Sequence, residues 1–165
     1  MPISASPLDL TGTGYCASFN FRRAARAVTR LYDLALQESG IRSTQFTILV
    51  GIAKSQPVSV GTLGDILLID RTTLARSLQL LRKERLISIS ARSTMRQRFL
   101  AVTRKGEHAL SRSLPIWRKI QGRFVQAVGS CHWLELRDEL ERLAAIAMVL
   151  EDPKNSGRER SQRED

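Results

Sequence analysis

One segment of this 165-residue chain, Asp70 to Arg85 (DRTTLARSLQLLRKER), limits its possible folds more than any other. Its leucines have the i, i+4, i+7 spacing of one apolar face of an α-helix: Leu74, Leu78 and Leu81. Asp70 precedes this helix as an N-cap, whose carboxylate accepts hydrogen bonds from unpaired backbone N–H groups. Four polar residues fall on the opposite side: Thr72, Arg76, Gln79 and Lys83. The helix either exposes a solvated basic face or presents that face to the major groove of DNA.

The preceding sequence favours the DNA interpretation. Val60 to Ile69 (VGTLGDILLI) is a short predicted helix with Ser59 as its cap. Its predicted buried side consists of Leu63, Ile66 and Leu67. A tight turn at Leu68–Asp70 joins it to the next helix. Two short helices joined in this way form a helix-turn-helix, in which the second helix reads DNA.

Two β-rich runs follow, Leu86 to Ser90 (LISIS) and Arg98 to Val102 (RFLAV), with a short basic stretch between them. They predict a two-stranded hairpin, or wing, whose basic tip suits the minor groove, where the negative potential of DNA is concentrated. From Arg71 to Arg98 the chain has eight Arg and Lys residues and one acidic residue, Glu84. Most of the formal net charge of +10 therefore lies in this motif, which general solubility does not explain.

The expected DNA contacts follow from donor and acceptor chemistry. Arg reads guanine, Gln reads adenine, and Thr and Lys hold phosphates or base edges. The predicted base readers are Thr72, Thr73, Arg76 and Gln79. The predicted phosphate contacts on the same helix are Arg71 and Lys83. The predicted contacts of the wing are Arg92, Arg96 and Arg98.

The N-terminal part predicts two helices. Ser18 to Glu38 carries a long apolar stripe and stops before Gly40, a helix C-cap. Ser43 to Lys54 follows, with Ser43 as its cap. Four arginines crowd the other side of the first helix: Arg22, Arg23, Arg26 and Arg30. They form a solvated charged face or, for one or two of them, a site for an anion or a ligand carboxylate.

After the wing, Thr103 caps a predicted helix from Arg104 to about Ala127, and Cys131 to Leu150 forms the last helix. The apolar stripe of the last helix is too long for one small winged helix to cover. With the N-terminal helix, these two helices predict a hydrophobic homodimer interface. The expected parts are a flexible arm (1–17), a helical dimerisation region (18–42 and 104–150), a winged helix-turn-helix (43–103) and a disordered charged tail (151–165). The fold class is mainly α with a small β-hairpin wing.

The chain resembles the multiple-antibiotic-resistance regulator (MarR) family in the order of its parts. Two predicted helices are followed by IDRTTLARSLQLLRKERLISIS and then by RQRFLAVTRKGEHAL. The resemblance extends over roughly Phe19 to Leu150 and includes FRRAARAVTRLYD and STQFTILVGI. It implies an obligate homodimer, a palindromic operator in double-stranded DNA, and often repression relieved by a small ligand or by oxidation. Wings of this family usually carry Asp-x-Arg at the tip, whereas Thr94 stands in the Asp position before Arg96. This departure implies an Arg96 that is braced differently, or held more loosely, than in the family.

The resemblance also implies a pocket for a small-molecule effector, anionic if arginines contribute, between the dimerisation helices and the DNA-reading lobe. Tyr32, Phe46 and Trp117 are candidates to line it, although large aromatics at helical spacing also occur as plain core. Cys16 in YCASF is placed like the sensing cysteine of organic-hydroperoxide regulators in this family, with Cys131 as a second thiol across the dimer. The alternative is that both cysteines are ordinary small residues.

Other functional classes lack their signatures in this sequence. Glycine-rich nucleotide loops, a hydrolase elbow and metal-ligand spacing do not occur, so no enzyme activity, metal site or cofactor is expected. No apolar run approaches about 18 residues, and the N-terminus does not read as a signal peptide, so we expect a cytoplasmic protein without a membrane segment. A non-specific architectural DNA-binding protein is the alternative to a sequence-specific regulator.

Overall fold

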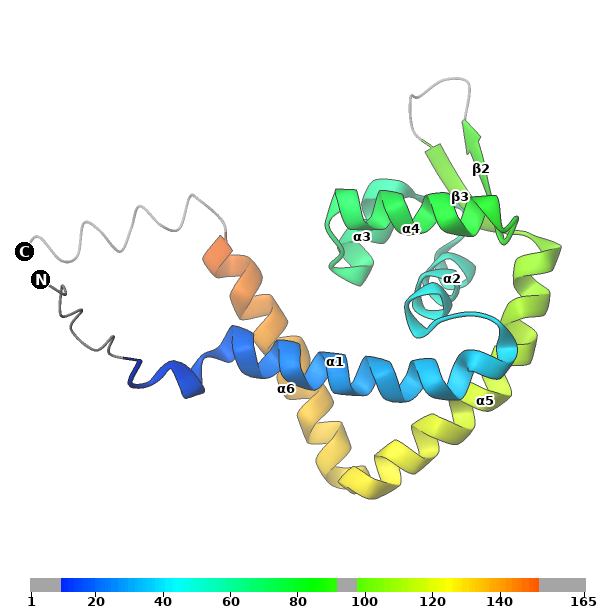
Figure 1. The fold of residues 1–165 in the computed structure, drawn as a ribbon. Helices are drawn as coiled ribbons and strands as arrows, with labels where there is room; N and C mark the ends of the chain where they lie inside the picture. The colour runs from blue at the N-terminus through cyan, green and yellow to red at the C-terminus, as the bar shows by residue number, and fades with distance from the viewer. Residues whose placement is uncertain (1–9, 92–97, 152–165) are drawn as a thin grey trace, which may run out of the picture. The chain divides into compact units, whose positions relative to one another are not determined.

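The structure is a computed structural model that describes residues 10–91 and 98–151 (Figure 1). Within these ranges it is mainly helical with a small three-stranded antiparallel sheet, which confirms the predicted fold class. The chain forms two compact units, the first ending at Ile120 and the second beginning at Gln121. No helix in the described ranges is long and apolar enough to cross a membrane.

The first unit begins with a short 3-10 helix, η1 (Thr13–Tyr15), and the long helix α1 (Ala17–Leu36). A second 3-10 turn, η2 (Gln37–Ser39), ends at Gly40. The φ angle of Gly40 is 79°, in the left-handed region that glycine adopts without steric cost. The predicted N-terminal helix and its glycine stop are therefore confirmed. Leu36 is the only buried residue of α1, so most of its apolar stripe is accessible in the single chain.

α2 (Ser43–Ser55) packs against α1. Its buried apolar residues are Phe46, Ile48, Leu49 and Ile52. The prediction that Ser43 caps this helix is wrong, because Ser43 is the first helical residue and Arg42 occupies the N-cap position. The carboxylate of Asp33 accepts hydrogen bonds from the backbone N and from the Oγ of Ser43, each at 2.7 Å. A residue in α1 thus supplies the acceptor that a local cap would provide.

The predicted helix-turn-helix is formed by α3 (Val60–Leu67) and α4 (Arg71–Lys83). Ser59 caps α3, because its Oγ accepts a hydrogen bond from the N–H of Thr62 at 3.1 Å. Ile66 departs from the prediction, since it is 52% exposed rather than buried.

The turn between α3 and α4 is tight. Leu68 has a φ angle of 50°, a left-handed conformation that is uncommon outside glycine. The N–H of Ile69 donates to the carbonyl of Gly64 at 3.0 Å. A Cβ at Gly64 would lie 3.3 Å from the carbonyl oxygen of Ile69, so a glycine allows the chain to approach this closely.

Three strands form the sheet, in the order β1 (Val58–Ser59), β3 (Arg98–Val102) and β2 (Ile87–Ala91). β2 and β3 are the predicted wing strands, with β2 shifted by one residue along the sequence. β1 was not predicted, because two residues are too few to show strand alternation. It pairs antiparallel to β3, with Val58 opposite Leu100, and both side chains are buried.

α5 (Arg104–Val128) begins directly after the wing, and Thr103 caps it as predicted. The Oγ1 of Thr103 accepts a hydrogen bond from the N–H of Gly106 at 3.1 Å. Gly106 is buried against the carbonyl of Leu86, where β2 begins. The largest fully buried apolar side chains of this unit come from α1, α2, α3, α4 and β3: Leu36, Leu49, Ile52, Leu63, Leu74, Leu81 and Leu100.

The second unit contains the end of α5 and α6 (Ser130–Glu151). The two helices meet at Gly129, which has a φ angle of 93°. Phe124 and Trp133 pack edge to face, with ring centroids 5.6 Å apart. α6 has no buried residue, although it carries many large apolar side chains.

Candidate nucleic-acid interface

The outward side of α4 presents polar residues that are predicted to contact DNA. Its inward side is held by leucines that are at most 4% exposed: Leu74, Leu78 and Leu81. On the other side, residues at i, i+4, i+7 and i+11 are exposed, and we call them the α4 stripe: Thr72, Arg76, Gln79 and Lys83. Within the described residues, neither Arg76 nor Lys83 forms a salt bridge. Their charges are therefore available to a phosphate or a base edge.

The first turn of α4 is held by a charged cap. The carboxylate of Asp70 accepts a hydrogen bond from the backbone N–H of Thr73 at 2.9 Å. Hydrogen bonding to Thr73, with a smaller contribution from the charge of Arg76, lowers the pKa of the Asp70 carboxyl below its ordinary value. A negative charge at this position also complements the helix dipole.

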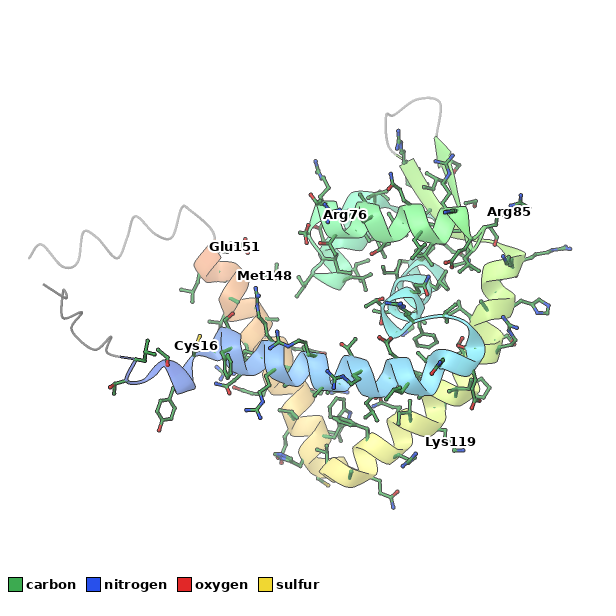
Figure 2. The ribbon with its side chains drawn as sticks, in the orientation of Figure 1. Cys16, Arg76, Arg85, Lys119, Met148 and Glu151 are labelled. Atoms are coloured by element: carbon green, nitrogen blue, oxygen red, sulfur yellow. The ribbon has the colours of Figure 1, made fainter. Side chains whose placement is uncertain are left out.

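The C-terminal end of α4 is tied to α2 and α5 by four residues that we call the α4 clamp: Gln45, Glu84, Thr103 and Lys105. The Nε2 of Gln45 donates to the Glu84 carboxylate at 3.2 Å, and the Nζ of Lys105 donates to the Glu84 carbonyl at 2.9 Å. Arg85 follows with a φ angle of 60°, and its carbonyl accepts a hydrogen bond from the Oγ1 of Thr103 at 2.7 Å. The clamp fixes how α4 is presented. Arg76 lies on α4, and Arg85 lies just after the end of this helix (Figure 2).

Sequence reasoning did not find the clamp, because its members are far apart in the chain. Gln45 and Glu84 are 39 positions apart, and Lys105 is 21 positions from Glu84. Gln45 is only 8% exposed, but the polar sequence around it (STQFT) gave no sign of this burial.

The wing lies beside α4, and β2 contacts it (Figure 1). Arg98 begins β3 opposite Ala91, and it is exposed. The predicted minor-groove residues Arg92 and Arg96 lie outside the described residues. The remaining predicted phosphate contact, Arg71, is exposed in the first turn of α4.

Thr73 lies on a different side of α4 from the α4 stripe. Together with Ser77 it lines a cavity of about 710 Å³ that also involves α1, α2, α3 and α5. Tyr32, Phe46 and Trp117, the three residues predicted for an effector pocket, all line this space, which we call the aromatic cavity.

The aromatic cavity has an ordered aromatic wall. The rings of Phe46 and Trp117 stack with centroids 5.9 Å apart and an interplanar angle of 24°. Burial raises the pKa of the Tyr32 hydroxyl above its ordinary value, which favours the neutral form further. The cavity is within the size range of small-molecule sites, and one flank of α4 forms part of its wall.

The two cysteines are both exposed and are not joined in a disulfide. Cys16 occupies the N-cap position of α1 (Figure 2), and Cys131 lies in the first turn of α6. Among the described residues there is no cluster of three or more His, Cys, Asp or Glu side chains that could hold a metal ion.

Known proteins match both the sequence and this arrangement. A family model described as the MarR family matches residues 39–94. The M. tuberculosis transcriptional regulator MosR, solved in complex with DNA, is 33% identical to this chain, with a TM-score of 0.76. The match covers 82% of this chain and 98% of MosR. The chain belongs to the MarR family. Members of this family are winged-helix transcription regulators rather than enzymes.

More distant MarR-type structures share the fold. The S. aureus MepR–DNA complex is 15% identical, with a TM-score of 0.68, and covers 79% of this chain and 97% of its own. S. aureus MarR in complex with salicylate and kanamycin is 23% identical, with a TM-score of 0.65, and covers 84% of this chain and 95% of its own. A comparison with curated protein sequences finds no match.

Proposed function

We propose that this MarR-family protein is a homodimeric repressor that binds a palindromic operator and leaves it when a small ligand occupies the aromatic cavity. Each protomer places the α4 stripe in a major groove and the wing in the adjacent minor groove. Such a regulator works in the compartment that holds the DNA, the cytoplasm expected from the sequence.

The α4 stripe is the observation that carries this proposal. It combines an arginine, a glutamine, a threonine and a lysine on one exposed helix face, which are the side chains that read base edges and hold phosphates. The opposite face is fixed by buried leucines, and both ends of α4 are hydrogen-bonded, at Asp70 and at Glu84. A helix whose backbone is held in this way loses little backbone freedom on binding. The MosR and MepR complexes with DNA support the same use of the fold.

Exposed apolar side chains support the homodimer. Large apolar residues of α1 and α6 are between 36% and 66% exposed in the single chain: Phe19, Phe21, Val28, Leu31, Leu34, Leu134, Leu136, Leu140, Ile146, Met148, Val149 and Leu150. Exposed apolar side chains in this number, on each of the two helices, are typical of an obligate protein interface. A two-fold dimer would present two α4 helices to DNA, which is why we expect a palindromic operator.

Release by a ligand is supported by the position of the aromatic cavity. Thr73 and Ser77 of α4 belong to its wall, so an occupant would contact the helix that carries the α4 stripe. A ligand shifts the protein between binding and non-binding states only by its difference in affinity for the two, and direct contact with α4 supplies such a difference. The S. aureus MarR complex with salicylate supports a small aromatic acid as the first compound to test.

Binding to DNA is the experiment that tests this function. The purified protein is titrated with its own upstream DNA and with scrambled DNA of equal length, across a salt series. We expect a preference for the upstream fragment of about 10³-fold or more near physiological salt. Equal affinities that fall together as salt rises would instead indicate a non-specific DNA-binding protein.

Oxidation is a second candidate trigger for release. The thiol of Cys16 is exposed at the start of α1, where a peroxide can reach it. Oxidation to a sulfenic acid, followed by a disulfide with a second thiol such as Cys131, would change the N-terminal region of a dimer. Release of DNA by peroxide, reversed by a thiol reductant, would support this trigger.

A further inference from the structure

A groove lined by arginines runs along α1, apart from the aromatic cavity. Arg22, Arg26 and Arg30 stand at i, i+4 and i+8 on one side of this helix, and Arg42 adds a fourth guanidinium from the segment before α2. The space between them measures about 960 Å³, and all four arginines are exposed. We call this feature the arginine groove. We propose that it is a binding site for a small polyanion, a molecule that carries two or more phosphate or carboxylate groups.

The charges of the groove are not neutralised within the described part of the chain. None of the four guanidinium groups forms a salt bridge there. Asp33 is the only acidic residue of α1 and also lines the groove, where its Oδ1 accepts two hydrogen bonds from Ser43. Its single negative charge against four arginines leaves the lining with a net charge of +3. Like charges at i, i+4 spacing destabilise a helix, so the stripe favours an external anion that relieves this repulsion.

The geometry selects an anion with several charged groups. With a rise of 1.5 Å per residue, Arg22 and Arg30 are about 12 Å apart along α1. Guanidinium groups bind phosphates and carboxylates through paired, charge-assisted hydrogen bonds. A single small anion would engage one or two arginines, whereas an anion with several charged groups can engage more of them, because each guanidinium is carried on a long flexible side chain.

The position of the groove separates it from the DNA-binding surface. α1 and α4 lie on opposite sides of α2 in Figure 1. Val28, Tyr32 and Leu36 of α1 line the aromatic cavity, whereas the arginines flank it, and Thr29 lines both spaces. The proposed site therefore does not depend on the DNA-binding function.

Titration calorimetry of the full chain with inorganic triphosphate tests the proposal. The groove variant is Arg26→Gln with Arg30→Gln, which keeps good helix formers and removes two charges. Two control variants remove the same charge elsewhere: Arg118→Gln with Lys119→Gln at exposed positions of α5, and Arg71→Gln with Arg76→Gln on α4. We expect one triphosphate per chain, and affinity weakened about tenfold or more in the groove variant alone.

Each other outcome overturns the proposal. Equal losses in all three variants would show attraction by net charge, and a loss confined to the α4 variant would place the anion on the DNA-binding surface. Absence of binding to the unaltered protein would leave no site. If the groove variant bound DNA more weakly in the absence of triphosphate, DNA would be the occupant of the groove. If the groove variant differed in mass in solution from the unaltered protein, the groove would be a contact between protein chains. A parallel titration with citrate decides whether carboxylates serve as well as phosphates.

Discussion

The contact between Gly106 and the base of the wing gives a quantitative prediction for Gly106→Ala. A Cβ at this position would lie 2.1 Å from the carbonyl oxygen of Leu86 and 2.6 Å from Cγ1 of Val102. The Leu86 carbonyl cannot rotate away freely, because it accepts a hydrogen bond from the N–H of Thr103 at 3.0 Å. Relief therefore requires the first turn of α5 and the start of β2 to separate.

The magnitude follows from two opposing effects. Alanine in a helix interior is favoured over glycine by roughly 0.5–1 kcal/mol. Overpacking costs typically 1–3 kcal/mol and occasionally more, and a backbone obstacle places this substitution at about 3–4 kcal/mol. Subtracting the gain from alanine leaves a net loss of about 2–3 kcal/mol. For a chain of this size that loss lowers the melting temperature by about 4–12 °C. Moving the base of the wing should also weaken DNA binding.

Differential scanning calorimetry at equal protomer concentration measures this loss. The matched control is Gly122→Ala in the same helix, where an added Cβ would meet nothing within 4 Å. The control should gain roughly 0.5–1 kcal/mol from helix propensity alone. If Gly106→Ala were as stable as Gly122→Ala, the packing described at the base of the wing would be wrong.

Four further substitutions test other parts of the structure. Arg76→Ala should reduce discrimination between operator and scrambled DNA by about 1–3 kcal/mol in competition binding, and an unchanged ratio would remove Arg76 from the base readers. The pKa of Asp70 is lowered from 3.8, so the ionised carboxylate contributes its full stabilisation above that pH. This contribution is lost as the pH falls through the lowered pKa and the carboxylate becomes protonated. Asp70→Asn keeps the capping oxygen, so its melting temperature should fall less steeply below about pH 4, and parallel curves would contradict the charged cap. Leu68→Gly should raise the free energy of unfolding by roughly 1 kcal/mol or less in urea titrations, because glycine adopts a φ of 50° without strain. A lower free energy of unfolding would contradict the proposed strain at Leu68. Cys16→Ser should remove any DNA release caused by peroxide, and a variant that still responds would end the redox hypothesis.

Local patterns predicted the elements whose causes are local. Asp70 and the leucines of α4 are close neighbours in sequence, so the helix and its cap were visible before the structure. Ser59 and Thr103 were identified as caps for the same reason. Ser43 was misassigned because its hydrogen-bond acceptor, Asp33, comes from another helix.

In the candidate site too, features set by local sequence were predicted and features set by tertiary packing were not. The spacing of Arg76 and its neighbours in the α4 stripe depends only on helix geometry, and the structure places them on one exposed face. The α4 clamp depends on tertiary packing that joins α2, α4 and α5, and no periodicity reveals it. Three arginines of the arginine groove, Arg22, Arg26 and Arg30, stood out in the sequence, whereas Arg42 joins them only through the turn before α2.

Three sides of α4 are occupied by different tasks, and this limits how its sequence can evolve. Leucines face the core, the α4 stripe faces outward, and Thr73 with Ser77 faces the aromatic cavity. Point substitutions can change one side without touching the others, because each side has its own positions at a period of 3.6 residues. An insertion or deletion of one residue would rotate every later side chain by about 100° and exchange the three sets. Under the proposed function, operator and ligand preference could therefore change separately by substitution, whereas a change in the length of α4 between Asp70 and Glu84 would disturb both.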